Sequence, residues 1–157
     1  MKIKLIIIGK TTDSNLVQLE EIYKNRLKHY LPFDVVVIPE LKNTKNLSTT
    51  EIKEKEADLL LKALDVNDEV ILLDERGKEY TSVGFSAFLE KKQQTSLKCI
   101  VFVIGGAYGF SERIYSRTNS LVSLSKMTFS HQMVRLFFIE QLYRAMTILK
   151  GEPYHHQ

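Results

Sequence analysis

Residues 98–109 read Lys98-Cys-Ile-Val-Phe-Val-Ile104-Gly-Gly-Ala-Tyr-Gly109, a short apolar run that ends in a glycine-rich turn. Such a run predicts a strand that is buried on both faces, as strands of parallel sheets are. The glycines that follow allow a tight turn and bring bare backbone N–H and C=O groups within reach of a ligand. Because ligands bind at the carboxyl ends of parallel strands, this turn indicates a binding site.

Four more strands and five helices are expected around this segment, and they alternate along the chain. The expected strands span residues 3–8, 33–38, 69–74 and 121–124, and the expected helices span about 14–30, 48–64, 82–94, a short stretch from 111, and 131–150. This alternation predicts an α/β fold, with a parallel sheet covered by helices on both faces. No linker, repeat or low-complexity segment divides residues 1–157, so one domain is expected.

The last helix is apolar over more than half of its circumference. One stripe of apolar residues recurs every three or four positions, and further apolar residues lie on other faces: Val134, Phe138, Leu142, Ala145 and Leu149 in the stripe, Leu136, Phe137 and Tyr143 outside it. A helix of this kind must cover the sheet and contact something else. A homodimer is the simplest expectation.

Composition limits the remaining classes of function. The net charge of +3 permits a phosphate-rich partner such as RNA without requiring one. The only cysteine, Cys99, cannot form an internal disulfide, which fits a reducing compartment. The longest apolar run in the first ten residues, Leu5–Ile8, is too short for a signal peptide or a membrane span. A cytoplasmic protein is expected, without a membrane partner and, since its four histidines are scattered, without a metal site.

Three strand ends carry distinctive residues, at 73–78 (LDERGK), 104–110 (IGGAYGF) and 124–129 (LSKMTF). Each segment also has a simpler explanation. Residues 73–78 could be only a charged turn, the glycines of 104–110 could be needed only for positive φ, and 124–129 could be an ordinary loop. The glycine spacing is not that of a dinucleotide-binding fingerprint, and no Walker or Ser/His/Asp pattern occurs. Three such ends in one sheet together favour a ligand site.

These segments, with residues 124–145 (LSKMTFSHQMVRLFFIEQLYRA) and the final PYHH at 153–156, resemble the SPOUT-class methyltransferases. Within that class the chain is most similar to the RlmH (YbeA) family, and the likeness runs from the opening strand to the tail. The resemblance implies a SPOUT α/β/α fold with a C-terminal trefoil knot, a rare exception to unknotted topology. It also implies a homodimer, S-adenosylmethionine as cofactor, and methylation of N3 of a pseudouridine in 23S rRNA on assembled ribosomes, with no role for DNA.

The resemblance also implies which residues line the cofactor pocket. They come from all three strand ends: Leu73, Gly105, Leu124, Ser125, Lys126, Met127, Thr128 and Phe129. Apolar side chains would sandwich the adenine while exposed backbone groups read its edge.

Catalysis requires that N3 lose its proton and that the negative charge on the base be stabilised. Arg144, one helical turn after Glu140, is the candidate for stabilising that charge, with a purely structural ion pair as the alternative. Tyr154 and His155 in the tail are candidates for assisting deprotonation or for clamping a flipped base. His131 is the alternative base, or else caps the start of the last helix. Members of the family often have a basic residue where this chain has His156, followed here by Gln157.

Two other functions remain open at this point. A flavodoxin-like nucleotide-binding protein would use the Gly105 turn and the helix at Ser111 to bind a phosphate. A non-enzymatic ribosome assembly factor would associate with ribosomes but transfer no methyl group.

Overall fold

The computed structural model describes residues 1–156, and Gln157, the last residue of the tail, lies outside it. The strands are β1 (Lys2–Ile8), β2 (Phe33–Ile38), β3 (Glu69–Glu79), β4 (Cys99–Ile104) and β5 (Ser120–Ser123). The helices are α1 (Ser14–Leu27), α2 (Thr49–Ala63), α3 (Ser82–Gln93), α4 (Glu112–Arg117) and α5 (Met133–Leu149). The strands form one sheet in the order β2-β1-β4-β3-β5, and all four pairings are parallel. The predicted α/β class and parallel sheet are confirmed.

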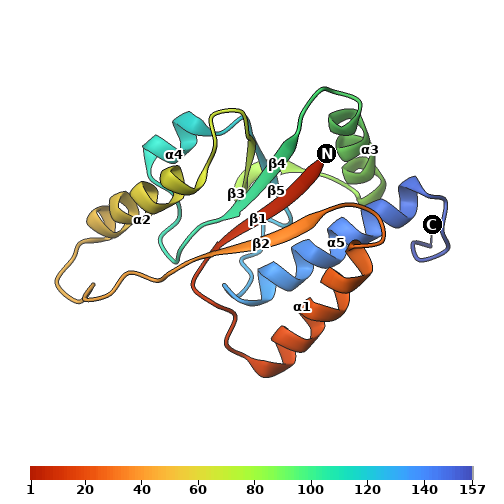
Figure 1. Ribbon diagram of the computed structural model, residues 1–157. Coiled ribbons are helices and arrows are strands. Elements are labelled where there is room, and N and C mark those ends of the chain that lie inside the picture. Colours follow the sequence, from red (N-terminus) through yellow and green to blue (C-terminus); the bar gives the residue numbers. More distant parts are fainter. Residues whose placement is uncertain (157) are drawn as a thin grey trace.

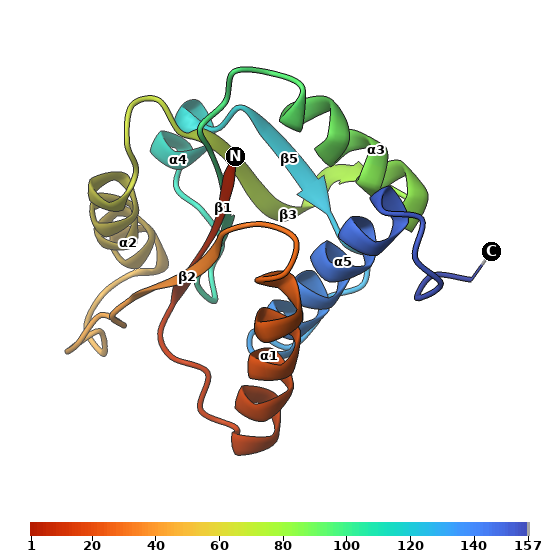
Figure 2. The same cartoon turned by 45° about the vertical axis from the view of Figure 1, so that its right-hand side comes forward.

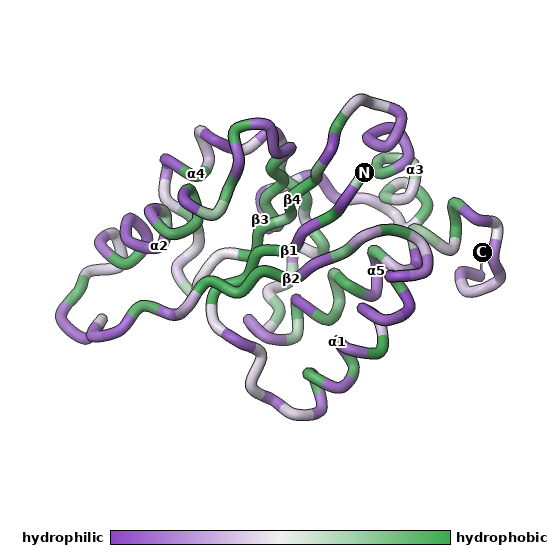
Figure 3. Tube along the Cα trace, viewed as in Figure 1, coloured by the Kyte–Doolittle hydropathy of each residue, from purple (hydrophilic) through white to green (hydrophobic). Residues whose placement is uncertain are grey.

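Helices cover both faces of the sheet (Figure 1). Helices α1, α3 and α5 lie on one face and α2 and α4 on the other, which the turned view in Figure 2 also shows. Alternate residues of β1 divide between the two cores: Ile3, Leu5 and Ile7 face α5, whereas Ile6 and Ile8 face α2. In Figure 3 the strands are largely hydrophobic, whereas hydrophobic and hydrophilic residues alternate along the helices.

Helix α2 begins at the predicted capping box. The Ser48 hydroxyl accepts a hydrogen bond from the Glu51 N–H at 3.1 Å, and the Glu51 carboxylate accepts one from the Ser48 N–H at 2.7 Å. Two backbone donors that the helix leaves free are thereby satisfied.

We expect Ser48→Ala to lower the free energy of unfolding by about 1 kcal/mol, because the Glu51 N–H loses its acceptor. Urea denaturation followed by circular dichroism measures this change. Thr50→Ala, two residues further along and outside the capping hydrogen bonds, is the control. An equal loss in both variants would contradict the assignment.

Strand β3 extends beyond its predicted end. The prediction stopped at Asp74, but β3 continues to Glu79. Both Leu73 and Lys78 pair with Val122 of β5, so the residues between them form a bulge. Gly77 allows this bulge, because a Cβ there would come within 2.6 Å of the Val122 backbone.

The broad apolar surface of α5 is largely explained by neighbours within the chain. Phe138 and Leu142 are fully buried against the sheet, and the Tyr143 ring packs on those of Tyr23 and Tyr30 from the α1 side. Phe137 remains 38% exposed. The helix therefore covers the sheet as predicted, and Phe137 is the large apolar side chain it leaves at the surface.

Across residues 1–156, no helix combines the length and the apolar character needed to cross a bilayer.

Candidate active site

The three predicted strand ends meet around one cavity of about 660 Å³. It lies at the carboxyl edge of the sheet, beside the bulge of β3 and the ends of β4 and β5. Every residue of the predicted cofactor set lines this cavity except Lys126. The Lys126 side chain is 86% exposed, and its Nζ lies 3.9 Å from a carboxylate oxygen of Glu79. Lys126 is therefore placed at the outside of the cavity wall.

The glycine turn after β4 is needed both for backbone geometry and for space. Gly109 has a φ of 81°, in the left-handed region that favours glycine. A Cβ on Gly105 would lie 3.0–3.3 Å from the Phe110 ring, which also lines the cavity. A side chain at Gly105 would therefore push into the Phe110 ring or into the cavity.

The bulge in β3 forms a polar wall of the cavity. Asp74 accepts hydrogen bonds from the Tyr115 hydroxyl and, at 2.8 Å, from the Arg76 N–H. Burial raises the pKa of Asp74, but these hydrogen bonds outweigh it, so the pKa falls below its ordinary value. The Arg76 guanidinium lies over the Tyr115 ring, 4.5 Å from its centroid. The wall therefore presents an ionised carboxylate and a fixed phenol.

His131 lines the same cavity, at its boundary with α5. Its Nε2 lies 3.2 Å from Nη2 of Arg135, a residue that is only 1% exposed. Neither Arg135 nor Tyr115 was among the predicted site residues. For Arg135 the available signal was one arginine inside the apolar segment Val134–Ile139.

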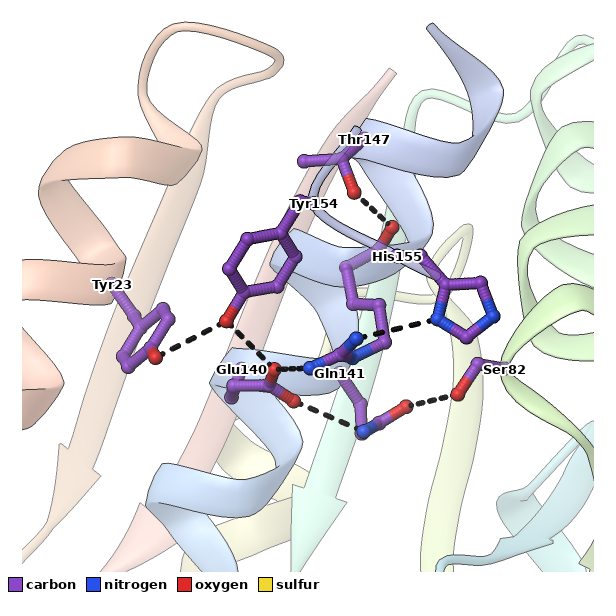
Figure 4. Close-up of polar contacts among 8 residues, drawn as sticks. Tyr23, Ser82, Glu140, Gln141, Thr147, Tyr154 and His155 are labelled. Atoms are coloured by element: carbon purple, nitrogen blue, oxygen red, sulfur yellow. Dashed lines mark hydrogen bonds and ion pairs between the residues drawn. The ribbon is translucent and has the colours of Figure 1, made fainter. Parts of the chain in front are cut away.

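The other predicted catalytic residues form a separate hydrogen-bonded cluster, shown in Figure 4. One Glu140 oxygen accepts hydrogen bonds from Arg144 at 2.5 Å and from the Tyr154 hydroxyl at 2.9 Å. Nη1 of Arg144 lies 3.3 Å from Nδ1 of His155. The predicted Glu140–Arg144 pair is confirmed, and we call these residues with Tyr23, whose hydroxyl lies 3.2 Å from that of Tyr154, the tail cluster.

The tail cluster does not line the cavity of its own chain. Helix α5 starts beside the cavity at Val134 and runs back along the sheet, so the tail lies beyond its far end (Figure 1). Arg144 is ten residues further along, about 15 Å at the rise of an α-helix. Tyr30 also donates a hydrogen bond to Glu152, which fixes the tail against the end of α1. The structure thus brings Arg144, Tyr154 and His155 together but places them apart from His131.

Within residues 1–156, no group of three or more His, Cys, Asp and Glu side chains is arranged to hold a metal ion.

Comparison with known proteins identifies the class that this fold and cavity represent. A family described as predicted SPOUT methyltransferases matches residues 1–155, and the chain belongs to that family. It is similar over its whole length, and over the whole length of each relative, to three proteins named ribosomal RNA large subunit methyltransferase H. They come from Parabacteroides distasonis (60% identical), Flavobacterium johnsoniae (59%) and Christiangramia forsetii (57%). This membership sets aside the flavodoxin-like alternative and implies a methyl donor.

Proposed function

We propose that this chain methylates N3 of a pseudouridine in 23S rRNA, using S-adenosylmethionine, on assembled ribosomes in the cytoplasm. The observation that carries the proposal is the full-length similarity to proteins named ribosomal RNA large subunit methyltransferase H. The cavity at three strand ends supplies a place for the cofactor.

The cavity suits S-adenosylmethionine in size and in chemistry. Its volume of about 660 Å³ falls within the range of cofactor pockets. Leu73, Leu124 and Phe129 offer apolar surfaces for the adenine, and the Gly105 backbone is open to it. The ionised Asp74 is placed to attract a cationic group. The cofactor would supply a methyl group on a sulfonium, which needs a deprotonated nitrogen as acceptor.

Arg144 is suited to stabilise the negative charge of that acceptor. The hydrogen bond to Glu140 raises the pKa of Arg144, so its guanidinium stays charged. Its position is fixed on two sides, by Glu140 and by the Tyr154 ring, whose centroid lies 4.7 Å away. A fixed cation beside the base favours the anionic form of N3 without a rearrangement during the reaction.

Neither Tyr154 nor His155 is placed to remove the N3 proton. Burial and the hydrogen bonds with Tyr23 and Glu140 raise the pKa of Tyr154 far above its ordinary value, so it stays a phenol. A guanidinium has only donors, so the Arg144–His155 contact makes Nδ1 of His155 an acceptor and places the ring proton on Nε2. We infer that both residues clamp the base while the proton leaves to solvent.

A second copy of the chain would bring tail and cavity together. In one chain no residue of the tail cluster lines the cavity, and Arg144 lies about 15 Å along α5 from Val134, so a partner chain would bring the proposed catalytic groups to the cofactor. Phe137 is exposed and packs on the half-buried Phe129, with ring centroids 4.9 Å apart, so it offers an apolar contact beside the cavity. We therefore propose a homodimer in which each tail cluster serves the cavity of the other copy. The same family resemblance supports a trefoil knot in the C-terminal segment.

Light scattering at micromolar concentration is expected to give twice the chain mass of 18.2 kDa. Phe137→Glu should shift this mass toward that of one chain, because a charge would replace the exposed apolar contact. Glu90→Ala, an exposed position on α3, is the control. A single-chain mass for the unaltered protein would contradict the homodimer.

The function itself is tested by incubating the protein with ribosomes that lack the modification and methyl-labelled S-adenosylmethionine. Mass spectrometry of the digested rRNA should place the label on one pseudouridine. Binding to ribosomes without transfer of label would instead support an assembly factor.

Naked 23S rRNA is expected to be a much poorer substrate than the intact ribosome. An 18.2 kDa chain offers little surface for reading sequence, so we infer that the shape around the target selects it. Arg76 and Lys126, both mostly exposed beside the cavity, are placed to contact phosphates. Equal rates on both substrates, measured with the same labelled cofactor, would contradict this inference.

A further inference from the structure

Arg135 is a buried cation near the carboxyl end of β1. Its Nη2 donates to the Ile8 carbonyl at 2.7 Å, and its Nη1 donates to the Thr11 hydroxyl at 3.1 Å. Its Nε has no hydrogen-bond partner within residues 1–156. A buried guanidinium with an unsatisfied donor is costly, so its presence calls for a physical reason.

A direct ion pair does not provide that reason. Within the part of the chain that is described, no carboxylate lies within 4 Å of Arg135. Glu20 is reached only through Thr11, whose hydroxyl donates to it at 2.9 Å. Burial lowers the pKa of Arg135, and Glu20 and Glu40 oppose this effect from a distance. The guanidinium stays charged, as arginine does in proteins.

The remaining contact of Arg135 is with His131. Its Nη2 lies 3.2 Å from Nε2 of His131, and a guanidinium can only donate. Nε2 must therefore offer its lone pair, which leaves the ring neutral with its proton on Nδ1. The Ile8 carbonyl lies 3.4 Å from the same Nε2, but its closer donor is Arg135 at 2.7 Å. An Nε2–H that donated to this carbonyl would be the opposite tautomer, and the shorter contact with Arg135 decides for the Nδ1–H form of His131.

The ring of His131 also lines the cavity, and its Nδ1 has no hydrogen-bond partner among residues 1–156. We propose that Arg135 is a positioning residue that holds His131 as a neutral Nδ1–H donor, and that this donor binds an oxygen or ring nitrogen of the S-adenosyl ligand. The ligand part rests on the proposed function. It follows that His131 contributes to ligand binding and does not act as the base.

Two replacements of His131 distinguish the role of Nδ1 from that of Nε2. Asparagine places an amide N–H near the Nδ1 position, whereas glutamine extends to the Nε2 position and leaves Nδ1 unreplaced. We expect His131→Gln to weaken binding of S-adenosylhomocysteine about tenfold, the loss of one hydrogen bond, and His131→Asn to weaken it about threefold or less.

Isothermal titration calorimetry measures both affinities, and circular dichroism checks that the variants are folded. His29→Gln, an exposed histidine after α1, is the control and should bind like the unaltered chain. Equal affinities for His131→Asn and His131→Gln, or unaltered binding by His131→Gln, would overturn the proposal.

The tautomer is measured separately, without any ligand. In ¹⁵N–¹H correlation spectra of the imidazole rings at neutral pH, the signals lost in His131→Asn should have the pattern of a neutral ring protonated at Nδ1. A ring protonated at Nε2, or a charged ring, would overturn the pairing with Arg135. If the Nδ1–H pattern is present but the unaltered chain binds neither S-adenosylmethionine nor its demethylated product, the proposed function fails and the pairing stands.

Discussion

Replacing Arg144 with alanine is expected to lower kcat for methyl transfer to the ribosome by about 10³-fold, the size of effect seen when a preorganised charge-stabilising donor is removed. Arg144 is far from the cofactor cavity of its own chain, so affinity for S-adenosylhomocysteine should not change. Single-turnover transfer of labelled methyl to unmodified ribosomes measures the first quantity, and calorimetry the second. A loss of transfer that came with an equal loss of cofactor affinity would contradict the assigned role.

Two further variants separate chemistry from structure at Arg144. Arg144→Lys keeps a charge but loses the planar donor fork, so it should restore only part of the rate. Arg113→Ala removes a surface guanidinium that pairs with Glu54 and Asp58, and it should leave transfer unaltered. Loss of folded structure in Arg144→Ala, from the unpaired Glu140, would appear in circular dichroism. Arg144→Lys then tests the same role in a chain that keeps the ion pair.

Gly105→Val is expected to abolish measurable binding of S-adenosylhomocysteine. A Cβ at this position already meets the Phe110 ring at 3.0 Å, and the two further methyl groups of valine must occupy the cavity or displace the ring. Calorimetry on folded protein measures the effect.

The size of the side chain provides the internal control for this prediction. Gly105→Ala should weaken binding less than Gly105→Val does. Gly84→Ala, on α3, should bind normally, because Gly84 does not line the cavity. Unchanged affinity in Gly105→Val would remove this residue from the binding site.

The order and type of the helices and strands were predictable because the apolar residues of each element have the spacing that is typical of a helix or of a buried strand. The run 98–104 and the capping box at Ser48 are examples in which local sequence determines local structure. The extension of β3 was not predictable in this way. Residues 74–77 are charged or glycine and have no strand alternation, and their bulge depends on pairing with β5 across the sheet.

The residues proposed to line the cofactor pocket were predicted through resemblance, and all of them but Lys126 line the cavity. Arg135 was not predicted, because a single charged residue in an apolar helix does not reveal its partners, which are Ile8 at the end of β1 and Thr11 in the loop that follows. The separation of the tail from the cavity was also not apparent. Residues close in sequence, such as His131 and Arg144, are held apart by the length of the helix between them.

The length of helix α5 therefore sets the distance between His131 and Arg144. One residue inserted between Arg135 and Glu140 would turn everything downstream by about 100° and advance it by about 1.5 Å. His131 and Arg135 would keep their contacts with β1, whereas Arg144 and Tyr154 would turn to a different side of the helix. Insertions and deletions should thus be tolerated in the exposed connection at residues 41–47 but not in helix α5.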